Sequence, residues 1–355
     1  MIAGAFVSTF AGPTPLALAE LNQLEFDPRV WAIGDTLAMA ERDGLDGVVL
    51  VRVGNAVAIH RAFGWADAEA KTRMTVETGF DIGSIVKPMN FCALLKLEEQ
   101  GKLALSDTLG KFFPEAPRDK AGITLLQIAD HRAGMRDVFG DDYEVVSREA
   151  FIQRAMTASL LYRPGTSERY SNSGYSLLAI VIERVTGETF ETYVRREILA
   201  PAGVTHIGYV QAGWKKDQLA VGYQGKKRWG TPLDHAWASD GPGWNLRGNG
   251  GFLGTAADLC QWYEALFDGK VLGPAALAKF YASMAGVSKR VGVPSIGHAG
   301  GNGVFNSLQV SYPAADVHLT LFTSTSGQPA EDVYKRFRIT LAEMAKAALP
   351  DSARR

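Results

Sequence analysis

Segments with the pattern of β-strands lie near the two ends of this 355-residue chain. Residues 47–53 and 56–63 are apolar or β-branched runs on either side of Gly54-Asn55, a pair typical of a tight hairpin turn. Three further strand-like runs follow at residues 295–299, 307–312 and 317–323. Residues 30–42 and 329–348 instead have the apolar spacing of amphipathic helices, and residues 74–285 are dominated by helical patterns and loops.

This distribution predicts an α+β fold in which both ends of the chain build one antiparallel sheet of about five strands. The terminal helices would flank the sheet, and a mostly helical domain would be inserted after the first strands. We therefore assign residues 26–73 plus 286–349 to a sheet domain and residues 74–285 to a mostly helical domain. Residues 1–25 and 350–355 are assigned to terminal tails.

The composition excludes several classes of function. The 37 Lys and Arg residues nearly balance the 38 Asp and Glu residues, so nothing indicates a nucleic-acid partner. Cys92 and Cys260 fall in apolar helical patterns and are interpreted as buried thiols. The six histidines show none of the paired spacings of zinc sites, so we predict no metal. We also predict no membrane-spanning segment.

The N-terminus leaves the localisation open. Its first nineteen residues carry no charged side chain and end in the small-x-small sequence Ala17-Leu18-Ala19, as a cleaved export signal would. However, no Lys or Arg precedes the apolar part, and Pro13 and Pro15 interrupt it. A periplasmic or secreted protein and a cytoplasmic protein with an N-terminal tail both remain hypotheses.

The strongest chemical signal is the segment DIGSIVKP at residues 81–88, which places Ser84 at the start of a predicted helix. Residues three apart share a helix face, so Lys87 should lie beside the Ser84 hydroxyl. A desolvated lysine can be neutral and accept the proton of that hydroxyl. Pro88 is tolerated because the first backbone N–H groups of a helix have no partner within the helix.

Two other segments accompany this pair. The turn-rich segment RPGTSERYSNSGY at residues 163–175 presents Tyr170 and Asn172 just before an apolar helix. The segment GHAGGNG at residues 297–303 places His298 at the end of a strand that enters a glycine-rich loop. Gly300 and Gly301 there would let a substrate approach the backbone closely.

With these three segments, the chain resembles the superfamily of serine β-lactamases and penicillin-binding proteins. The resemblance covers about residues 30–345 and is carried by S-x-x-K at residues 84–87, Y-x-N at residues 170–172 and an H-x-G version of the K-T-G strand at residues 298–300. The branch it resembles contains class C β-lactamases, D-alanyl carboxypeptidases, D-aminopeptidases and β-lactamase-like esterases. The sequence between these motifs also resembles that of the family, for example GNGGFLGT at residues 248–255.

The resemblance implies a β-lactamase/transpeptidase-like fold and a role for each motif residue. Ser84 would be the acylated nucleophile, and Lys87 and Tyr170 would share the general-base and general-acid work, in an order that the sequence does not settle. Asn172 would hydrogen-bond Lys87 or the substrate amide. The backbone N–H groups of Ser84 and Gly301 would form the oxyanion hole, and no cofactor is implied.

The chain also departs from the family pattern. His298 replaces the lysine that meets the carboxylate of penicillins in true β-lactamases, and an imidazole is mostly neutral near pH 7. Anionic β-lactams should therefore bind less well. His131 is interpreted as a structural residue at a helix end. The pair Arg132-Ala133 replaces the small hydroxylated pair of relatives, which leaves the neighbouring contacts open.

These observations predict a serine hydrolase for small-molecule esters, amides or peptides, with an esterase as the favoured subtype. A D-stereospecific peptidase or D-alanyl carboxypeptidase, a weak β-lactamase and an acyltransferase use the same residues and remain alternatives. A catalytically idle binding protein is the hypothesis from another class, and the oligomeric state cannot be deduced. Asp137 and Arg247 could touch substrate, although loop ion pairs are favoured for both. Candidate pocket residues are Phe139, Tyr143, Tyr223, Trp244 and Phe305.

Overall fold

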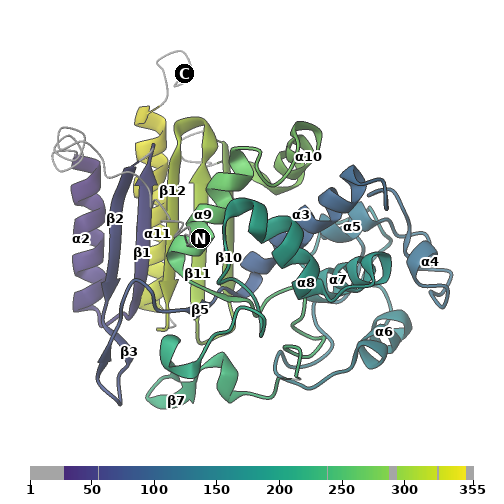
Figure 1. The fold of residues 1–355 in the computed structure, drawn as a ribbon, viewed down its shortest axis with the longest axis horizontal. Helices are drawn as coiled ribbons and strands as arrows, with labels where there is room; N and C mark the ends of the chain where they lie inside the picture. The colour runs from purple at the N-terminus through teal and green to yellow at the C-terminus, as the bar shows by residue number, and fades with distance from the viewer. Residues whose placement is uncertain (1–27, 55, 238, 288–293, 326–327, 349–355) are drawn as a thin grey trace, which may run out of the picture.

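A six-stranded antiparallel sheet with the order β2-β1-β12-β11-β10-β9 forms one side of the molecule, on the left in Figure 1. The computed structural model describes residues 28–54, 56–237, 239–287, 294–325 and 328–348. The tails or export segment predicted at residues 1–25 and 350–355 lie outside these residues. The strands of the sheet are β1 (Gly47–Val53), β2 (Ala56–Phe63), β9 (Ala285–Val287), β10 (Pro294–Gly301), β11 (Asn306–Tyr312) and β12 (Val317–Thr323).

The sheet joins the two ends of the chain, as predicted. β1 pairs with β2 on one side and with β12 on the other, in a register that runs from Gly47 opposite Thr323 to Val53 opposite Val317. The five predicted strands are all present, and the three-residue β9 adds a sixth at the edge beside β10. The predicted α+β class with its antiparallel sheet is therefore confirmed.

Both faces of the sheet are buried at residues 47–51, which explains why β1 is apolar up to Val51 and carries its one charged residue, Arg52, only near its end. Val49 and Val51 point toward the helices α2 (Pro28–Arg42) and α11 (Gln328–Ala348), while Val48 and Leu50 belong to the larger core on the opposite face. Successive side chains of a strand point to opposite faces, so a strand covered on both sides has no position left for a polar alternation. The two terminal helices flank the sheet, as expected from their apolar spacing (Figure 1).

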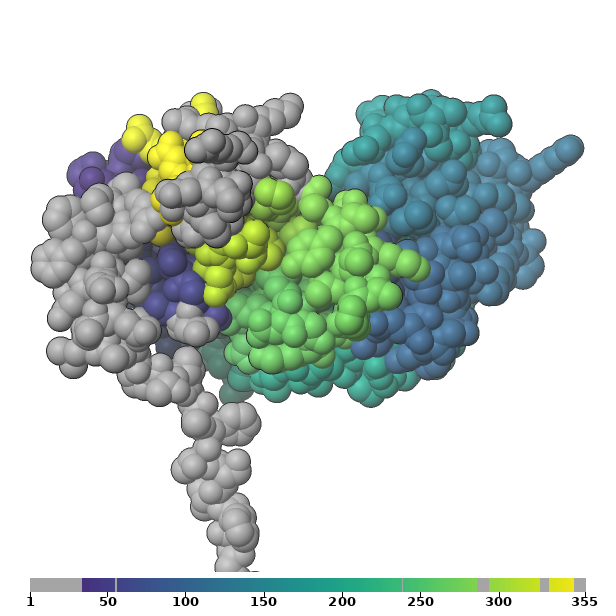
Figure 2. All heavy atoms as spheres, turned by 90° about the horizontal axis from the view of Figure 1, so that it is seen from above, coloured from purple at the N-terminus to yellow at the C-terminus, as the bar shows by residue number. Residues whose placement is uncertain are grey.

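The opposite face carries helix α9 (Ala256–Phe267) and leads into the helical part of the molecule. Figure 2 shows the blue and teal residues of this part massed beside the purple and yellow residues of the two chain ends, with green residues between them. At its centre, α3 (Val86–Glu99) packs against α7 (Asn172–Thr186), both almost fully buried. The other α-helices of the described residues are α4 (Leu109–Phe112), α5 (Leu125–Ala129), α6 (Arg148–Thr157), α8 (Phe190–Val194) and α10 (Pro274–Met284).

Three two-stranded ribbons, which the sequence analysis did not predict, connect these parts. They are formed by β3 (Trp65–Asp67) with β4 (Thr72–Arg73), β5 (Phe80–Asp81) with β8 (Leu253–Gly254), and β6 (Gly222–Gln224) with β7 (Lys227–Gly230). The β5–β8 ribbon matters most for function, because the chain leaves β5 directly into the segment that carries Ser84. In the described part of the chain, no helix is both long and apolar enough to cross a membrane.

The packing of α11 on the sheet gives a first test. Phe337 has an exposed fraction of 0% in the cluster between α2, α11 and the sheet. Phe337→Ala should lower the free energy of unfolding by about 3–5 kcal/mol, because it removes buried apolar area and leaves a cavity. Chemical denaturation measures the change. Lys335→Ala on the exposed side of α11 is the control and should stay within about 0.5 kcal/mol of wild type; equal effects would contradict this packing.

Candidate active site

The segment that carries Ser84 is held tightly between the sheet and the helical part. Ile82 donates its N–H to Phe252 O at 2.9 Å, and Ser307 Oγ donates to Ile82 O at 2.8 Å. Gly83 has a φ of +51°, a conformation that L side chains rarely adopt, and it opens the 3₁₀ turn η1 (Gly83–Ile85). The turn continues directly into α3, so Ser84 lies just before the first turn of that helix, close to the predicted position.

Lys87 is completely buried beside Ser84, with an exposed fraction of 0%. Its Nζ lies 2.9 Å from Ser84 Oγ, 2.6 Å from Asn172 Oδ1 and 2.7 Å from the Asn249 carbonyl oxygen. The predicted contacts with Ser84 and Asn172 are both present. The carbonyl of Asn249 is an addition that the sequence analysis missed, although residue 249 lies in the glycine-rich segment that carried part of the resemblance.

These three neighbours suit a neutral amine. An uncharged Lys87 has two N–H bonds and one lone pair, and the two carbonyl oxygens of Asn172 and Asn249 can only accept hydrogen bonds. The lone pair is then left for the Ser84 hydroxyl, which can donate. Burial lowers the pKa of Lys87 to about 7, against an opposing effect of the nearby Asp137 and Asp142 carboxylates. The arrangement can therefore remove a proton from Ser84 near neutral pH.

Tyr170 reaches the same serine from the loop before α7. Burial raises the pKa of its phenol to about 12, although a hydrogen bond with Ser84 acts in the opposite direction. Its ring also lies against Lys87, with Nζ 4.8 Å from the ring centroid. Tyr170 is thus an O–H donor near neutral pH, while Lys87 is the group that can be neutral.

His131 supports the tyrosine loop, in agreement with the structural role predicted for it. The backbone N–H of Ser171 donates to His131 Nδ1 at 3.1 Å, and the rings of His131 and Tyr170 lie 4.6 Å apart. Burial lowers the pKa of His131 to about 4, which keeps this nitrogen available as an acceptor. The α5 helix itself ends at Ala129, and His131 adopts a left-handed conformation with a φ of +58°.

Asn172 is oriented by Asp137. Asp137 Oδ1 accepts hydrogen bonds from Asn172 N at 3.0 Å and from Asn172 Nδ2 at 2.9 Å. The amide nitrogen of Asn172 is therefore turned toward Asp137, and its oxygen toward Lys87. This contact replaces the loop ion pair favoured for Asp137. Arg247, by contrast, does pair with a carboxylate, at 2.7 Å from Asp240.

Strand β10 brings Gly300 and Gly301 against the Ser84 segment. A Cβ atom on Gly300 would lie 2.8 Å from Ser84 N, and one on Gly83 would lie 2.6 Å from Gly301 N. Neither distance is compatible with a real side chain, so glycine is required on both sides of this contact. The backbone N–H groups predicted for the oxyanion hole, those of Ser84 and Gly301, therefore belong to two segments in direct backbone contact.

His298 lies on β10 near Lys87, but as a neutral group. Its Nδ1 is 2.8 Å from the Ala299 carbonyl oxygen, which can only accept, so the neutral ring carries its proton on Nδ1. Burial, together with the charge of Lys87, lowers the pKa of His298 to about 4. The ring then offers the lone pair of Nε2 instead of the positive charge that a lysine would supply.

Two of the predicted pocket-lining residues, Tyr143 and Phe305, belong to one aromatic cluster. Tyr143 packs on Trp229 and His235, and Trp229 packs in turn on Phe305. Tyr143 OH is 3.2 Å from Asn302 Nδ2 in the loop after Gly301, which places this aromatic cluster beside the site. The remaining predicted lining residues have other contacts: Phe139 packs on Phe151, Tyr223 bonds Asp67, and Trp244 is buried in the core.

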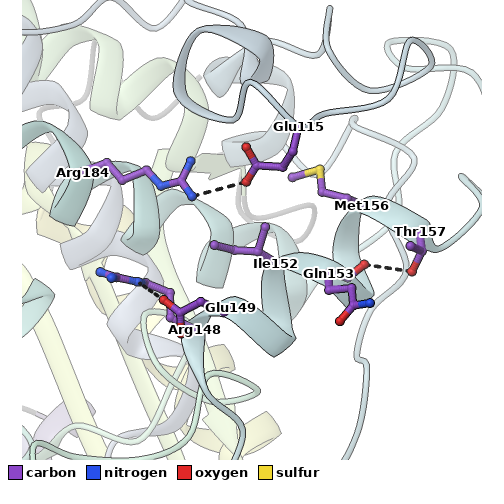
Figure 3. Close-up of a pocket in the computed structure, with 8 residues that line it drawn as sticks. All are labelled: Glu115, Arg148, Glu149, Ile152, Gln153, Met156, Thr157 and Arg184. Carbon is purple, nitrogen blue, oxygen red and sulfur yellow. Dashed lines mark hydrogen bonds and ion pairs between the residues drawn. The ribbon is translucent and has the colours of Figure 1, made fainter.

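A separate surface hollow of about 440 Å³ lies on the helical part (Figure 3). It is lined by Glu115, Arg148, Glu149, Ile152, Gln153, Met156, Thr157 and Arg184. Its arginines are paired with its own acids, Arg184 with Glu115 at 3.3 Å and Arg148 with Glu149 at 3.3 Å. It shares no residue with the Ser84 site. Among the described residues, no group of three or more His, Cys, Asp or Glu side chains could hold a metal ion.

The fold and the serine-lysine-tyrosine arrangement are those expected of the β-lactamase and penicillin-binding-protein superfamily. Comparison with known proteins agrees with this class. The family model described as Beta-lactamase matches residues 36–344. The chain therefore belongs to the β-lactamase family.

Individual relatives have low sequence identity to this chain. The chain is 29% identical over 238 residues to the putative penicillin-binding protein PbpX of Bacillus subtilis, a match that covers 67% of this chain and 59% of that protein. The hydrolase EstCE1, described as having promiscuous acyltransferase activity, has a TM-score of 0.72 at 23% identity, with 92% and 99% of the two chains covered. The D-amino acid amidase of Ochrobactrum anthropi has a TM-score of 0.71 at 18% identity, with 91% and 99% covered. These structural likenesses show the shared fold.

The lowered pKa of Lys87 gives a pH-dependent prediction. If neutral Lys87 is the base, kcat/KM for an ester should fall about tenfold per pH unit below pH about 7, because protonated Lys87 cannot accept the proton of Ser84. A profile from pH 5 to 9 in buffers of constant ionic strength measures this limb. Stability over the same range is checked by circular dichroism, and a flat profile with intact protein would contradict the assignment.

The charge of Asp137 should affect the pH at which this acidic fall in kcat/KM occurs. Its negative charge opposes the effect of burial on Lys87, so Asp137→Asn should lower the pKa of Lys87 further and move the acidic limb to lower pH. Asparagine keeps an oxygen that can accept the hydrogen bonds of Asn172. Asp141→Asn, which removes a nearby exposed charge, is the control and should leave the limb in place. Equal shifts in both variants would mean that only the general surface charge matters.

Proposed function

We propose that this protein is a serine hydrolase that forms an acyl-enzyme on Ser84 and acts best on uncharged esters or amides. The observation that carries the proposal is the buried Lys87, whose two carbonyl neighbours leave its lone pair directed at Ser84 Oγ at 2.9 Å. Such an arrangement activates a hydroxyl that is otherwise a poor nucleophile near pH 7.

The first half of the reaction follows from the two different pKa values. Neutral Lys87 takes the proton of Ser84 while Oγ forms a bond to the substrate carbonyl carbon. The resulting oxyanion lies near the N–H groups of Ser84 and Gly301, each of which contributes about 3 kcal/mol in sites of this kind. When the intermediate collapses, the bond to the leaving group breaks, and the leaving oxygen or nitrogen takes the proton of the Tyr170 hydroxyl. Lys87 then returns its proton to Tyr170.

The second half releases the acyl group by the same proton transfers. Water attacks the acyl carbon, its proton passes to the base, and the bond to Ser84 Oγ breaks as Oγ is reprotonated. An alcohol in place of water would accept the acyl group instead. The acyltransferase activity described for EstCE1, which shares the fold, supports this second outcome.

The preference for uncharged substrates rests on the charges around the site. His298 has a pKa lowered to about 4 and offers no cation to a substrate carboxylate. Asp137, which lies close enough to affect Lys87, contributes negative charge instead. Anionic penicillins should therefore bind poorly.

The same charges support a second candidate, an amidase or peptidase for substrates with a free amino group. Asp137 would attract an ammonium group, and the D-amino acid amidase of Ochrobactrum anthropi shares the fold. Hydrolysis of D- and L-amino acid p-nitroanilides at equal concentration separates this candidate from a simple esterase.

Intact-protein mass spectrometry tests the proposal. Wild type exposed to a fluorophosphonate should gain one adduct, and it should turn over p-nitrophenyl butyrate, whereas Ser84→Ala should lose labelling and lower ester turnover by about a thousandfold or more. Benzylpenicillin should give a much slower adduct than the ester. Ser167→Ala is a control for serine loss at an exposed position of the neighbouring loop and should still be labelled. Identical behaviour of wild type and Ser84→Ala would favour the idle-binding hypothesis.

A further inference from the structure

The carboxylate of Asp81 joins the two segments that supply the proposed oxyanion hole. Asp81 is the last residue of β5 and is buried, with an exposed fraction of 3%. Its Oδ1 accepts the backbone N–H of Gly83 at 2.8 Å, immediately before Ser84. Its Oδ2 accepts Asn302 Nδ2 at 3.1 Å, immediately after Gly301.

Asn302 transmits this contact to the loop between β10 and β11. Its Oδ1 accepts the backbone N–H groups of Val304 at 3.0 Å and Phe305 at 2.9 Å, which closes the loop that follows Gly301. Each oxygen of the Asp81 side chain is therefore tied to a different one of the two segments. A change at Asp81 would act on both segments at once.

Close contacts set the lower limit of the distance between these two segments, and hydrogen bonds set its upper limit. The glycine contacts between residues 83–84 and 300–301 prevent the segments from approaching further. The hydrogen bonds of Asp81 with Gly83 and Asn302, together with that of Ser307 with Ile82, oppose their separation. Oxyanion donors act only when they are placed within a few tenths of an ångström of the developing charge, and a misplacement of about 1 Å can cost about a hundredfold in rate.

We propose that Asp81 is a positioning residue that, through Asn302, sets the spacing of the Ser84 and Gly301 N–H groups for the proposed acyl transfer. The partners of Asp81 are all donors, because Tyr143 OH lies 3.4 Å from its Oδ2 in addition to the two N–H groups. An ionised carboxylate accepts all three. An amide at this position would place an NH₂ group against either the Gly83 N–H or the Asn302 NH₂.

This inference rests on the proposed function, and a double-mutant cycle tests it. Asp81→Asn should lower kcat for p-nitrophenyl butyrate about 10- to 100-fold with KM changed less than about threefold, because the transition state is affected more than substrate binding. Affinity for a phenylboronic acid, which forms a tetrahedral adduct on the serine, should fall by a similar factor. The acidic limb near pH 7 should keep its position, since Lys87 is not altered.

The double variant D81N/N302D transposes the carboxylate and the amide. The amide introduced at position 81 could then accept the Gly83 N–H and donate its NH₂ to the carboxylate introduced at position 302. The other oxygen of that carboxylate could still accept the Val304 and Phe305 N–H groups. This variant should recover kcat and boronate affinity to within about fivefold of wild type. Rescue of this kind would not follow from a general loss of structure.

Controls separate the possible failures. Asp46→Asn also removes a carboxylate that accepts a backbone N–H, that of Trp65, and it should leave kcat unchanged. If Asp81→Asn does not fold, Asn302→Ala in the partly exposed loop tests the same link and should show the same kcat loss. Unchanged kcat in folded Asp81→Asn, or a loss that D81N/N302D does not rescue, would overturn the inference. Absence of turnover in wild type itself would instead refute the proposed function.

Discussion

The burial of Lys87 is the constraint on which the site depends. Removing an ammonium group from water is unfavourable, and the fall of its pKa from 10.5 to about 7 corresponds to roughly 5 kcal/mol against the folded state at or below neutral pH. Between pH about 7 and 10.5 the unfolded chain binds the proton more readily than the folded chain. Stability from this group therefore rises with pH across that window, and the rest of the fold offsets the cost near neutral pH.

The packing of α3 offsets this cost, because Lys87 lies at the start of this almost fully buried helix. The same packing that excludes water from Lys87 holds its neighbours rigid: the Asn249 side chain donates to Ser176 Oγ and to Asn245 O, both at 2.8 Å, and so fixes the carbonyl that Lys87 meets. Asn90 on α3 donates to Tyr175 O and Gly248 O, which ties the two segments to the helix. The lowered pKa of Lys87 and the position of the Asn249 carbonyl therefore both follow from the buried contact of α3 with α7 and the glycine-rich segment.

Those parts of the site that depend on local periodicity could be predicted from sequence, and those that depend on distant backbone contacts could not. Ser84 and Lys87 are three residues apart on one turn, so their proximity follows from helix geometry alone. The Asn249 carbonyl is a backbone atom 162 residues from Lys87, and no side-chain pattern indicates it. The Asp81–Asn302 contact spans 221 residues. The two-residue strands β5 and β8, which position Asp81, are too short to show any period.

The choice of residue at position 298 links substrate charge to base strength. A lysine there would attract anionic substrates, but its charge would also oppose protonation of Lys87 and lower that pKa further. The neutral His298 removes both effects together, and the nearby charges of Asp137 and Asp142 act on Lys87 in the opposite direction. A second cation at position 298 would therefore take the pKa of Lys87 below about 7, so a base that works near neutral pH is favoured here by the absence of the cation that recognises carboxylates. The proposed preference for uncharged substrates and the pKa of Lys87 therefore have the same electrostatic cause.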